Sequence, residues 1–114
     1  GVLRERLGFG GLLVTDALDM GGVKGALPPE EVAVQALLAG ADVLLMPPDP
    51  LAARAAVAAA VRDGRVPAAR LDAAVRRVLT AKAKVGLLRG EGRVAPDWQQ
   101  RLATTEAKGT AARI

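Results

Sequence analysis

Two short apolar segments with one helical segment between them constrain the fold of this chain more than any other feature. The first segment is residues 11–15 (Gly-Leu-Leu-Val-Thr), and the second is residues 42–46 (Asp-Val-Leu-Leu-Met). Each is too short for a helix and apolar on both faces, which is typical of a buried strand in a parallel sheet. The helix between them is expected to begin at Glu30 and to end at Gly40. Together the three segments predict a βαβ unit.

The rest of the pattern is mainly helical. Residues 1–10 predict a short helical turn, because Leu3 and Leu7 lie one turn apart. Asp49 is the expected N-cap of an alanine-rich helix that ends at residue 62. A longer amphipathic helix is expected over residues 67–86, with its apolar side chains in one stripe.

These elements are too few for a complete sheet. Parallel sheets are found almost only with both faces covered, and a (β/α)₈ barrel needs eight strands and about 250 residues. We therefore expect an α/β fold that is the last quarter of such a barrel, with two parallel strands plus helices, incomplete on its own. Residues 1–88 are assigned to this barrel portion, and residues 89–114 to a linker and a weakly structured tail. The start at Gly1, without a visible signal peptide, fits a longer protein.

The sequence holds no cysteine and no histidine. Disulfides are thereby excluded, and so are a zinc site or a Ser–His pair completed within this chain. We expect no metal and no cofactor, so chemistry must rely on carboxylates, lysines or a partner. No apolar run approaches the roughly 18 residues of a membrane span. The lack of cysteine fits a reducing cytosol as well as secretion, and the cytoplasm is the expected location.

The formal net charge is +4, and many of the basic residues fall between Arg70 and Lys84. We interpret this stretch as a solvated outer helix face and not as a nucleic-acid site, because no aromatic side chain interleaves with the charges. The glycines of residues 8–11 precede the first strand and lack the dinucleotide-loop spacing. No phosphate-binding loop or nucleic-acid partner is therefore expected.

Asp16 is the main candidate for chemistry, because it directly follows the first predicted strand. Catalytic groups of barrels and open α/β sheets gather at the carboxyl ends of parallel strands. Taken alone, an aspartate at a strand end more often caps a turn. Asp42 begins the second strand at the opposite, stability end, and we interpret it as structural.

Three stretches, in this order and spacing, resemble glycoside hydrolase family 3. They are residues 7–20 (Leu-Gly-Phe-Gly-Gly-Leu-Leu-Val-Thr-Asp-Ala-Leu-Asp-Met), residues 36–47 and residues 70–87. The Thr-Asp-Ala-Leu-Asp-Met form looks more like the bacterial β-N-acetylhexosaminidases than the β-glucosidases, which tend to carry Ser-Asp-Trp. The resemblance implies that the first stretch is the seventh barrel strand, the second the eighth, and the third a closing helix.

By this resemblance Asp16 is the catalytic nucleophile of a retaining glycosidase acting on GlcNAc-containing glycosides. The family's acid/base residue is a histidine or a carboxylate that lies outside this chain, so the chain alone is expected to be inactive. Asp19 and Met20 follow in the loop; we favour a loop-stabilising acid and a lid, and retain Met20 as a candidate substrate-binding residue. The expected partners are the carbohydrate and the remainder of the barrel or another chain.

Three alternatives stay open. One is an inactive, truncated barrel remnant that acts only through self-association or a partner chain. Another is β-glucosidase activity of the same family. The third is an unrelated barrel that binds phosphate near its last strands, although Pro47 and Pro48 offer no backbone donors for it.

Overall fold

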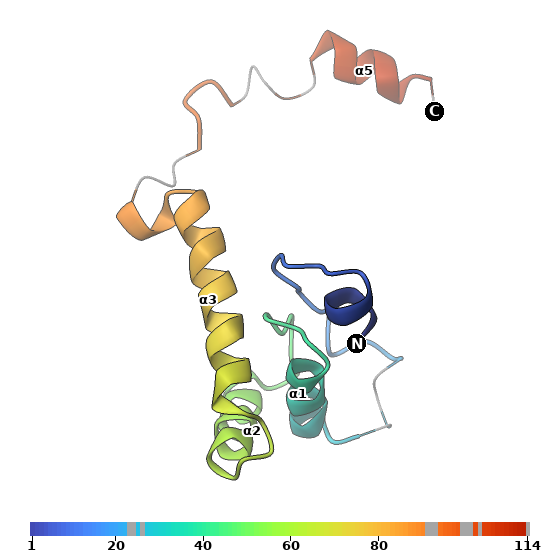
Figure 1. Ribbon diagram of the computed structural model, residues 1–114. Coiled ribbons are helices and arrows are strands. Elements are labelled where there is room, and N and C mark those ends of the chain that lie inside the picture. The colour runs from blue at the N-terminus through green and yellow to red at the C-terminus, as the bar shows by residue number, and fades with distance from the viewer. Residues whose placement is uncertain (23–24, 26, 91–93, 99–101, 103, 114) are drawn as a thin grey trace.

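The structure is a computed structural model that describes residues 1–22, 25, 27–90, 94–98, 102 and 104–113. Helices dominate it, and the helices predicted over residues 30–40, 51–62 and 67–86 are confirmed. In chain order the elements are the π-helical turn η1 (Val2–Arg6), the helices α1 (Pro29–Leu38), α2 (Pro50–Arg62) and α3 (Ala68–Lys84), the 3₁₀ turn η2 (Leu87–Arg89) and the helix α5 (Thr105–Ala111) (Figure 1).

Local sequence signals explain where these helices begin and end. The Asp49 carboxylate accepts hydrogen bonds from the N–H groups of Leu51 and Ala52, both at 2.9 Å, which satisfies two of the free donors at the start of α2. Helix α1 begins at Pro29, whose fixed backbone angle suits the first helical position. The chain leaves α1 through Gly40, whose φ of 113° suits glycine and few other residues.

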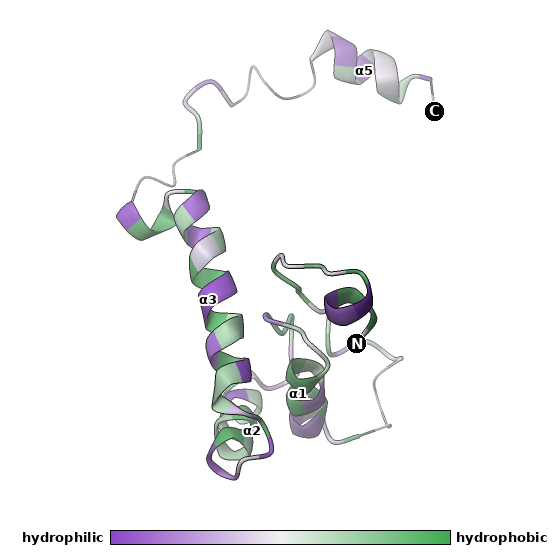
Figure 2. Cartoon of the chain, in the orientation of Figure 1, coloured by the Kyte–Doolittle hydropathy of each residue, from purple (hydrophilic) through white to green (hydrophobic). Residues whose placement is uncertain are grey.

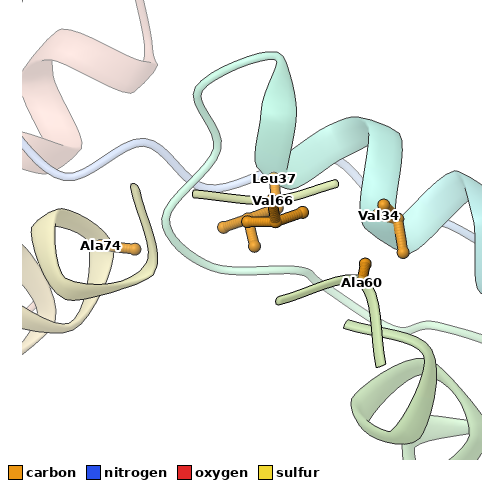
Figure 3. Close-up of a cluster of buried hydrophobic side chains, with 5 residues drawn as sticks. All are labelled: Val34, Leu37, Ala60, Val66 and Ala74. Atoms are coloured by element: carbon orange, nitrogen blue, oxygen red, sulfur yellow. The ribbon is translucent and has the colours of Figure 1, made fainter. Parts of the chain in front are cut away.

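The buried core lies where α1, α2 and α3 meet. Helix α1 packs mainly against α2 and more lightly against α3. In Figure 3 Val34 faces Ala60, while Leu37 and Val66 lie together between the helices. Small and medium aliphatic side chains make up this core: Val34, Leu37, Ala60, Val66 and Ala74. It is a modest core, since a stable domain of this length usually buries many large side chains.

The two predicted strands are present only as one parallel bridge between Val14 and Val43. Around it, Val43 N–H donates to the Leu13 carbonyl at 3.1 Å, and Thr15 N–H donates to the Val43 carbonyl at 3.1 Å. In a regular parallel ladder Leu45 N–H would come next and donate to the Thr15 carbonyl. It donates instead to the Thr15 hydroxyl at 2.9 Å. The ladder therefore stops after one repeat, and the two-strand prediction is not confirmed beyond the parallel pairing itself.

The described chain is extended for its length. Its radius of gyration is 18.4 Å, whereas a compact domain of this size has about 13 Å. Helix α5 stands apart from α1, α2 and α3 in Figure 1. Figure 2 shows hydrophobic and hydrophilic residues alternating along α3, as expected for an amphipathic helix.

Many large apolar side chains remain exposed on this framework. On α3 they include Val75 and Leu79, which are 48% and 46% exposed. Contiguous apolar exposure of this kind is typical of surfaces that make contacts with another element. Among the described residues no helix combines the length and apolar character needed to cross a membrane.

Candidate active site

Asp16 lies where the paired segments end, as the parallel arrangement predicts. Its side chain is exposed, and its Oδ1 atom accepts a hydrogen bond from the N–H of Ala17 at 2.8 Å. No other hydrogen bond or ion pair holds this carboxylate within the described part of the chain. Asp16 is thus a carboxylate fixed only by its own backbone and open to a ligand.

Thr15 positions the backbone next to Asp16. Its N–H donates to the Val43 carbonyl, and its hydroxyl accepts from Leu45 N–H, so both sides of the residue are bonded to the second segment. Sequence reasoning did not single out Thr15. A hydroxyl residue at the end of an apolar strand could have indicated this role. Ser and Thr side chains compete with backbone carbonyls for hydrogen-bond donors.

The carboxyl ends of both segments meet beside Asp16. Leu18 N–H donates to the Leu45 carbonyl at 2.9 Å, which brings the loop after Asp16 back against the end of the second segment. The next residue, Met46, has a φ of 44°, a left-handed conformation that is uncommon for a residue with a side chain. Strained backbone of this kind is often found at ligand sites.

Met20, the second candidate residue, lies in the turn after Asp16. Its N–H donates to the Ala17 carbonyl at 3.3 Å, and its side chain is half exposed. The turn therefore places Met20 on the same loop as Asp16, although no hydrogen bond joins the two residues.

A buried charge cluster lies at the opposite, amino end of the paired segments. Its centre is Asp42, whose side chain is 0% exposed. Oδ2 accepts from Leu13 N–H at 3.0 Å and from Arg4 of η1. Oδ1 accepts from Arg77 at 3.1 Å and lies 3.4 Å from the Arg70 guanidinium, both of which belong to α3. One carboxylate thus joins η1, the first segment and α3, which agrees with the structural role expected for Asp42.

The ionisation of Asp42 follows from these contacts. Burial is the largest influence and opposes the charged form, but it is outweighed by the hydrogen bond from Leu13 and the charges of Arg4 and Arg77. The pKa of Asp42 therefore lies below its usual value.

The cluster corrects one interpretation of the sequence. We expected the basic residues from Arg70 to Lys84 to form a solvated outer face. Arg70 and Arg77 instead turn inward to Asp42, and Arg70 also donates to the backbone carbonyls of Leu37, at 2.9 Å, and Ala41. Their partners lie 28 to 35 residues away along the chain, so the local pattern held no sign of them.

Three cavities lie along α2 and α3, and their walls are mainly apolar. The largest two have volumes of about 440 Å³ each, and one of them is lined by Leu44, Val57 and Leu71. Asp16 lines none of these cavities. In the described residues no three His, Cys, Asp or Glu side chains gather in a way that could hold a metal ion.

A model of the glycosyl hydrolase family 3 N-terminal domain matches residues 1–81. The β-N-acetylglucosaminidase/β-glucosidase of Cellulomonas fimi is 39% identical over 89 residues, which cover 78% of this chain and 16% of that protein.

Two solved structures extend the similarity to three dimensions. A family 3 β-N-acetylglucosaminidase from Paenibacillus sp. str. FPU-7 is 38% identical, with a TM-score of 0.71 over 83% of this chain and 18% of its own. The β-glucoside phosphorylase BglX is 33% identical, with a TM-score of 0.80 over 96% of this chain and 20% of its own. The chain thus spans at most about a fifth of the length of each of these proteins.

Proposed function

The chain belongs to glycosyl hydrolase family 3, and we propose that it is the part of a retaining glycosidase that supplies the nucleophile for hydrolysis of terminal N-acetyl-β-hexosaminides. The observation that carries this proposal is the place of Asp16, an exposed carboxylate at the carboxyl end of a parallel-paired segment. Relatives named β-N-acetylglucosaminidase and β-hexosaminidase support the choice of sugar.

In this proposal the chain is the last quarter of a (β/α)₈ barrel, and residues 1–88 are its barrel portion. The parallel pairing of residues 13–15 with residues 42–45 supports two adjacent barrel strands. The exposed apolar stripe of α3 supports contact with further barrel elements. Such elements would also flank the paired segments, since an isolated pair of strands is at best marginally stable.

The chemistry assigned to Asp16 is nucleophilic. Its ionised carboxylate attacks the anomeric carbon and forms a glycosyl-enzyme ester while the departing oxygen takes a proton. Water then cleaves the ester, with the same acid/base group removing the proton from water. That group lies outside this chain, and Met20 lines the sugar pocket beside the nucleophile.

A specific observation keeps β-glucosidase activity as the second candidate. The relative from Cellulomonas fimi carries both activities in its name, and a lysosomal β-glucosidase of Dictyostelium discoideum is 41% identical over 90 residues. The third candidate is an inactive remnant that acts only through self-association or a partner chain, and the exposed apolar side chains of α3 suit such a contact.

The test compares hydrolysis of nitrophenyl N-acetyl-β-glucosaminide and nitrophenyl β-glucoside by the protein isolated from its source, whose intact mass is measured at the same time. We expect release of nitrophenol from the N-acetyl substrate to fall by a factor of about 10³ or more in Asp16→Asn, because the covalent step loses its nucleophile. A slow fluorinated substrate should leave its sugar on the peptide that carries Asp16.

Asp63→Asn is the matched control, since Asp63 is an exposed carboxylate at the end of α2. Unchanged hydrolysis in Asp16→Asn would reject the nucleophile. Faster turnover of the plain glucoside would favour the β-glucosidase alternative. A mass near 11.7 kDa without hydrolysis of either substrate would favour the remnant.

A further inference from the structure

A further cleft lies at the amino end of the paired segments, at the opposite end from Asp16. It has a volume of about 250 Å³ and is formed between the loop at residues 10–12 and one face of α3. Arg76, Arg77 and Lys84 line it from the helix. From Leu12 to Asp16 the chain covers four extended residues, about 13 Å, so this cleft is distinct from the nucleophile.

The helix side of the cleft carries uncompensated positive charge. Arg76 and Lys84 are exposed, and within the described chain neither forms an ion pair. Arg77 is 31% exposed and uses one nitrogen, Nη1, for Asp42 and for its own helix. Asp72 lies one turn before Arg76 and shares a neighbouring cavity with it, but no ion pair joins them. Among the described residues no acidic side chain lines the cleft itself.

The loop side holds backbone N–H groups that no described residue uses. The carbonyls of Phe9 and Gly11 accept hydrogen bonds from Arg4 at 2.9 and 2.6 Å. In a trans peptide the N–H points away from the carbonyl of the same peptide, and the peptides from Phe9 to Leu12 are not cis. The N–H groups of Gly10 and Leu12 therefore point away from Arg4, and neither has a hydrogen-bond partner among the described residues.

We propose that this cleft between residues 10–12 and α3 binds a phosphate group, either as inorganic phosphate or on a small phosphorylated sugar. Guanidinium groups bind phosphate oxygens in a two-pronged manner, lysine adds a compact charge, and free backbone N–H groups add neutral donors. The cleft volume of about 250 Å³ equals that of roughly eight waters at about 30 Å³ each, so it has room for a group larger than a single water.

The site also differs from the phosphate site considered from the sequence. That alternative placed phosphate after the last strands, at the end where Pro47 and Pro48 lie. The cleft lies at the other end of the paired segments, and its donors come from the loop before the first segment and from α3. Its occupancy therefore does not require Asp16 or the proposed glycosidase activity.

The experiment is calorimetric titration of the full chain with inorganic phosphate and, separately, with glucose 6-phosphate, at constant ionic strength set by chloride. We expect saturable binding of at least one of them. The double variant Arg76→Gln/Lys84→Gln should weaken it by about tenfold or more, because two of the charged donors are lost. Arg62→Gln removes an exposed arginine of α2 outside the cleft, and this control should bind as the parent does.

A second pair of variants tests the loop side without touching any arginine. A Cβ atom added at Gly10 meets no atom within 4 Å and requires no left-handed backbone, so Gly10→Ala is sterically tolerated and Gly10→Asp adds a carboxylate from the same open position. We expect Gly10→Asp to weaken binding strongly by placing a negative charge in the cleft, and Gly10→Ala to change it little.

The relative affinities identify the source of the phosphate group. Tighter binding of glucose 6-phosphate than of inorganic phosphate supports a phosphorylated sugar, and equal binding supports free phosphate. Absence of saturable binding of both would overturn the site. Equal weakening by Arg62→Gln and by the double variant would overturn it as well, and so would unchanged binding in Gly10→Asp.

Discussion

The two ends of the paired segments differ sharply although the same few residues form both. At the amino end the buried carboxylate of Asp42 binds three arginines and a backbone N–H. At the carboxyl end the exposed carboxylate of Asp16 has one hydrogen bond, from the adjacent residue. The contrast teaches that one end of this unit is tied together by a buried charge, whereas the other presents an exposed carboxylate. A division between a stabilising end and an open end is typical of barrel enzymes.

The largest effect is expected from a substitution in the charge cluster at the amino end of the paired segments. Asp42→Ala should lower the free energy of unfolding by about 3 kcal/mol or more, because it leaves Arg4, Arg70 and Arg77 without their shared partner. Urea unfolding followed by circular dichroism measures this. Asp63→Asn, at an exposed site, should stay within about 0.5 kcal/mol of the parent. Equal losses of unfolding free energy in both variants would contradict the stabilising role of the buried carboxylate.

Low pH should reduce the stability that the charge cluster around Asp42 contributes. Because the pKa of Asp42 is lower in the folded protein than its usual value of 3.8, the unfolded chain binds the proton more readily. The stability contributed by Asp42 is full above its unfolded pKa and is lost as pH falls through the folded value. We expect unfolding free energies measured from neutral pH down to about pH 3 to fall less steeply in Asp42→Asn than in the parent. Parallel curves would show that other carboxylates govern acid unfolding.

At the carboxyl end a smaller effect is expected from Thr15→Val. The change keeps the shape of the side chain but removes the hydroxyl that accepts from Leu45 N–H. Water reaches this exposed bond, so we expect a loss of about 0.5–1 kcal/mol in unfolding free energy. Hydrogen exchange of the Leu45 amide should accelerate as well. Unchanged exchange would mean that the hydroxyl does not hold this amide.

The smallest effect, and one of opposite sign, is expected at Met46. Glycine adopts a positive φ without strain, so Met46→Gly should raise the free energy of unfolding by up to about 1 kcal/mol, less the added chain entropy. Thermal unfolding measures the change. If activity of the intact protein falls while stability rises, the strained backbone serves the site. A loss of stability would indicate that the Met46 side chain packs against something essential.

Much of the helical framework follows from local signals. Asp49 followed by Pro50 predicts the start of α2, and Gly40 predicts the exit from α1. The parallel pairing of the two apolar segments was also predictable from their order. The length of the strands was not, because the ladder ends where the Thr15 hydroxyl takes a bond that the backbone would otherwise accept.

The candidate site likewise has a part that the sequence predicts and a part that it does not. Asp16 is predictable because its position at a strand end depends on neighbours in sequence. The partners of Asp42 are not, since Arg4 lies 38 residues before it and the arginines of α3 lie 28 and 35 residues after it. Nothing in an amphipathic stripe tells which arginines turn inward. Whether Asp16 is the nucleophile and Met20 lines the pocket stays a prediction.

Three guanidinium groups contact the one carboxylate of Asp42, so each arginine is partly redundant for neutralising its charge. Losing any single arginine leaves two others to neutralise the buried charge, whereas losing the aspartate disconnects all of them at once. Substitution of a single arginine should therefore be tolerated better than substitution of Asp42. We expect Arg4, Arg70 and Arg77 each to tolerate substitution one at a time, and position 42 to require aspartate.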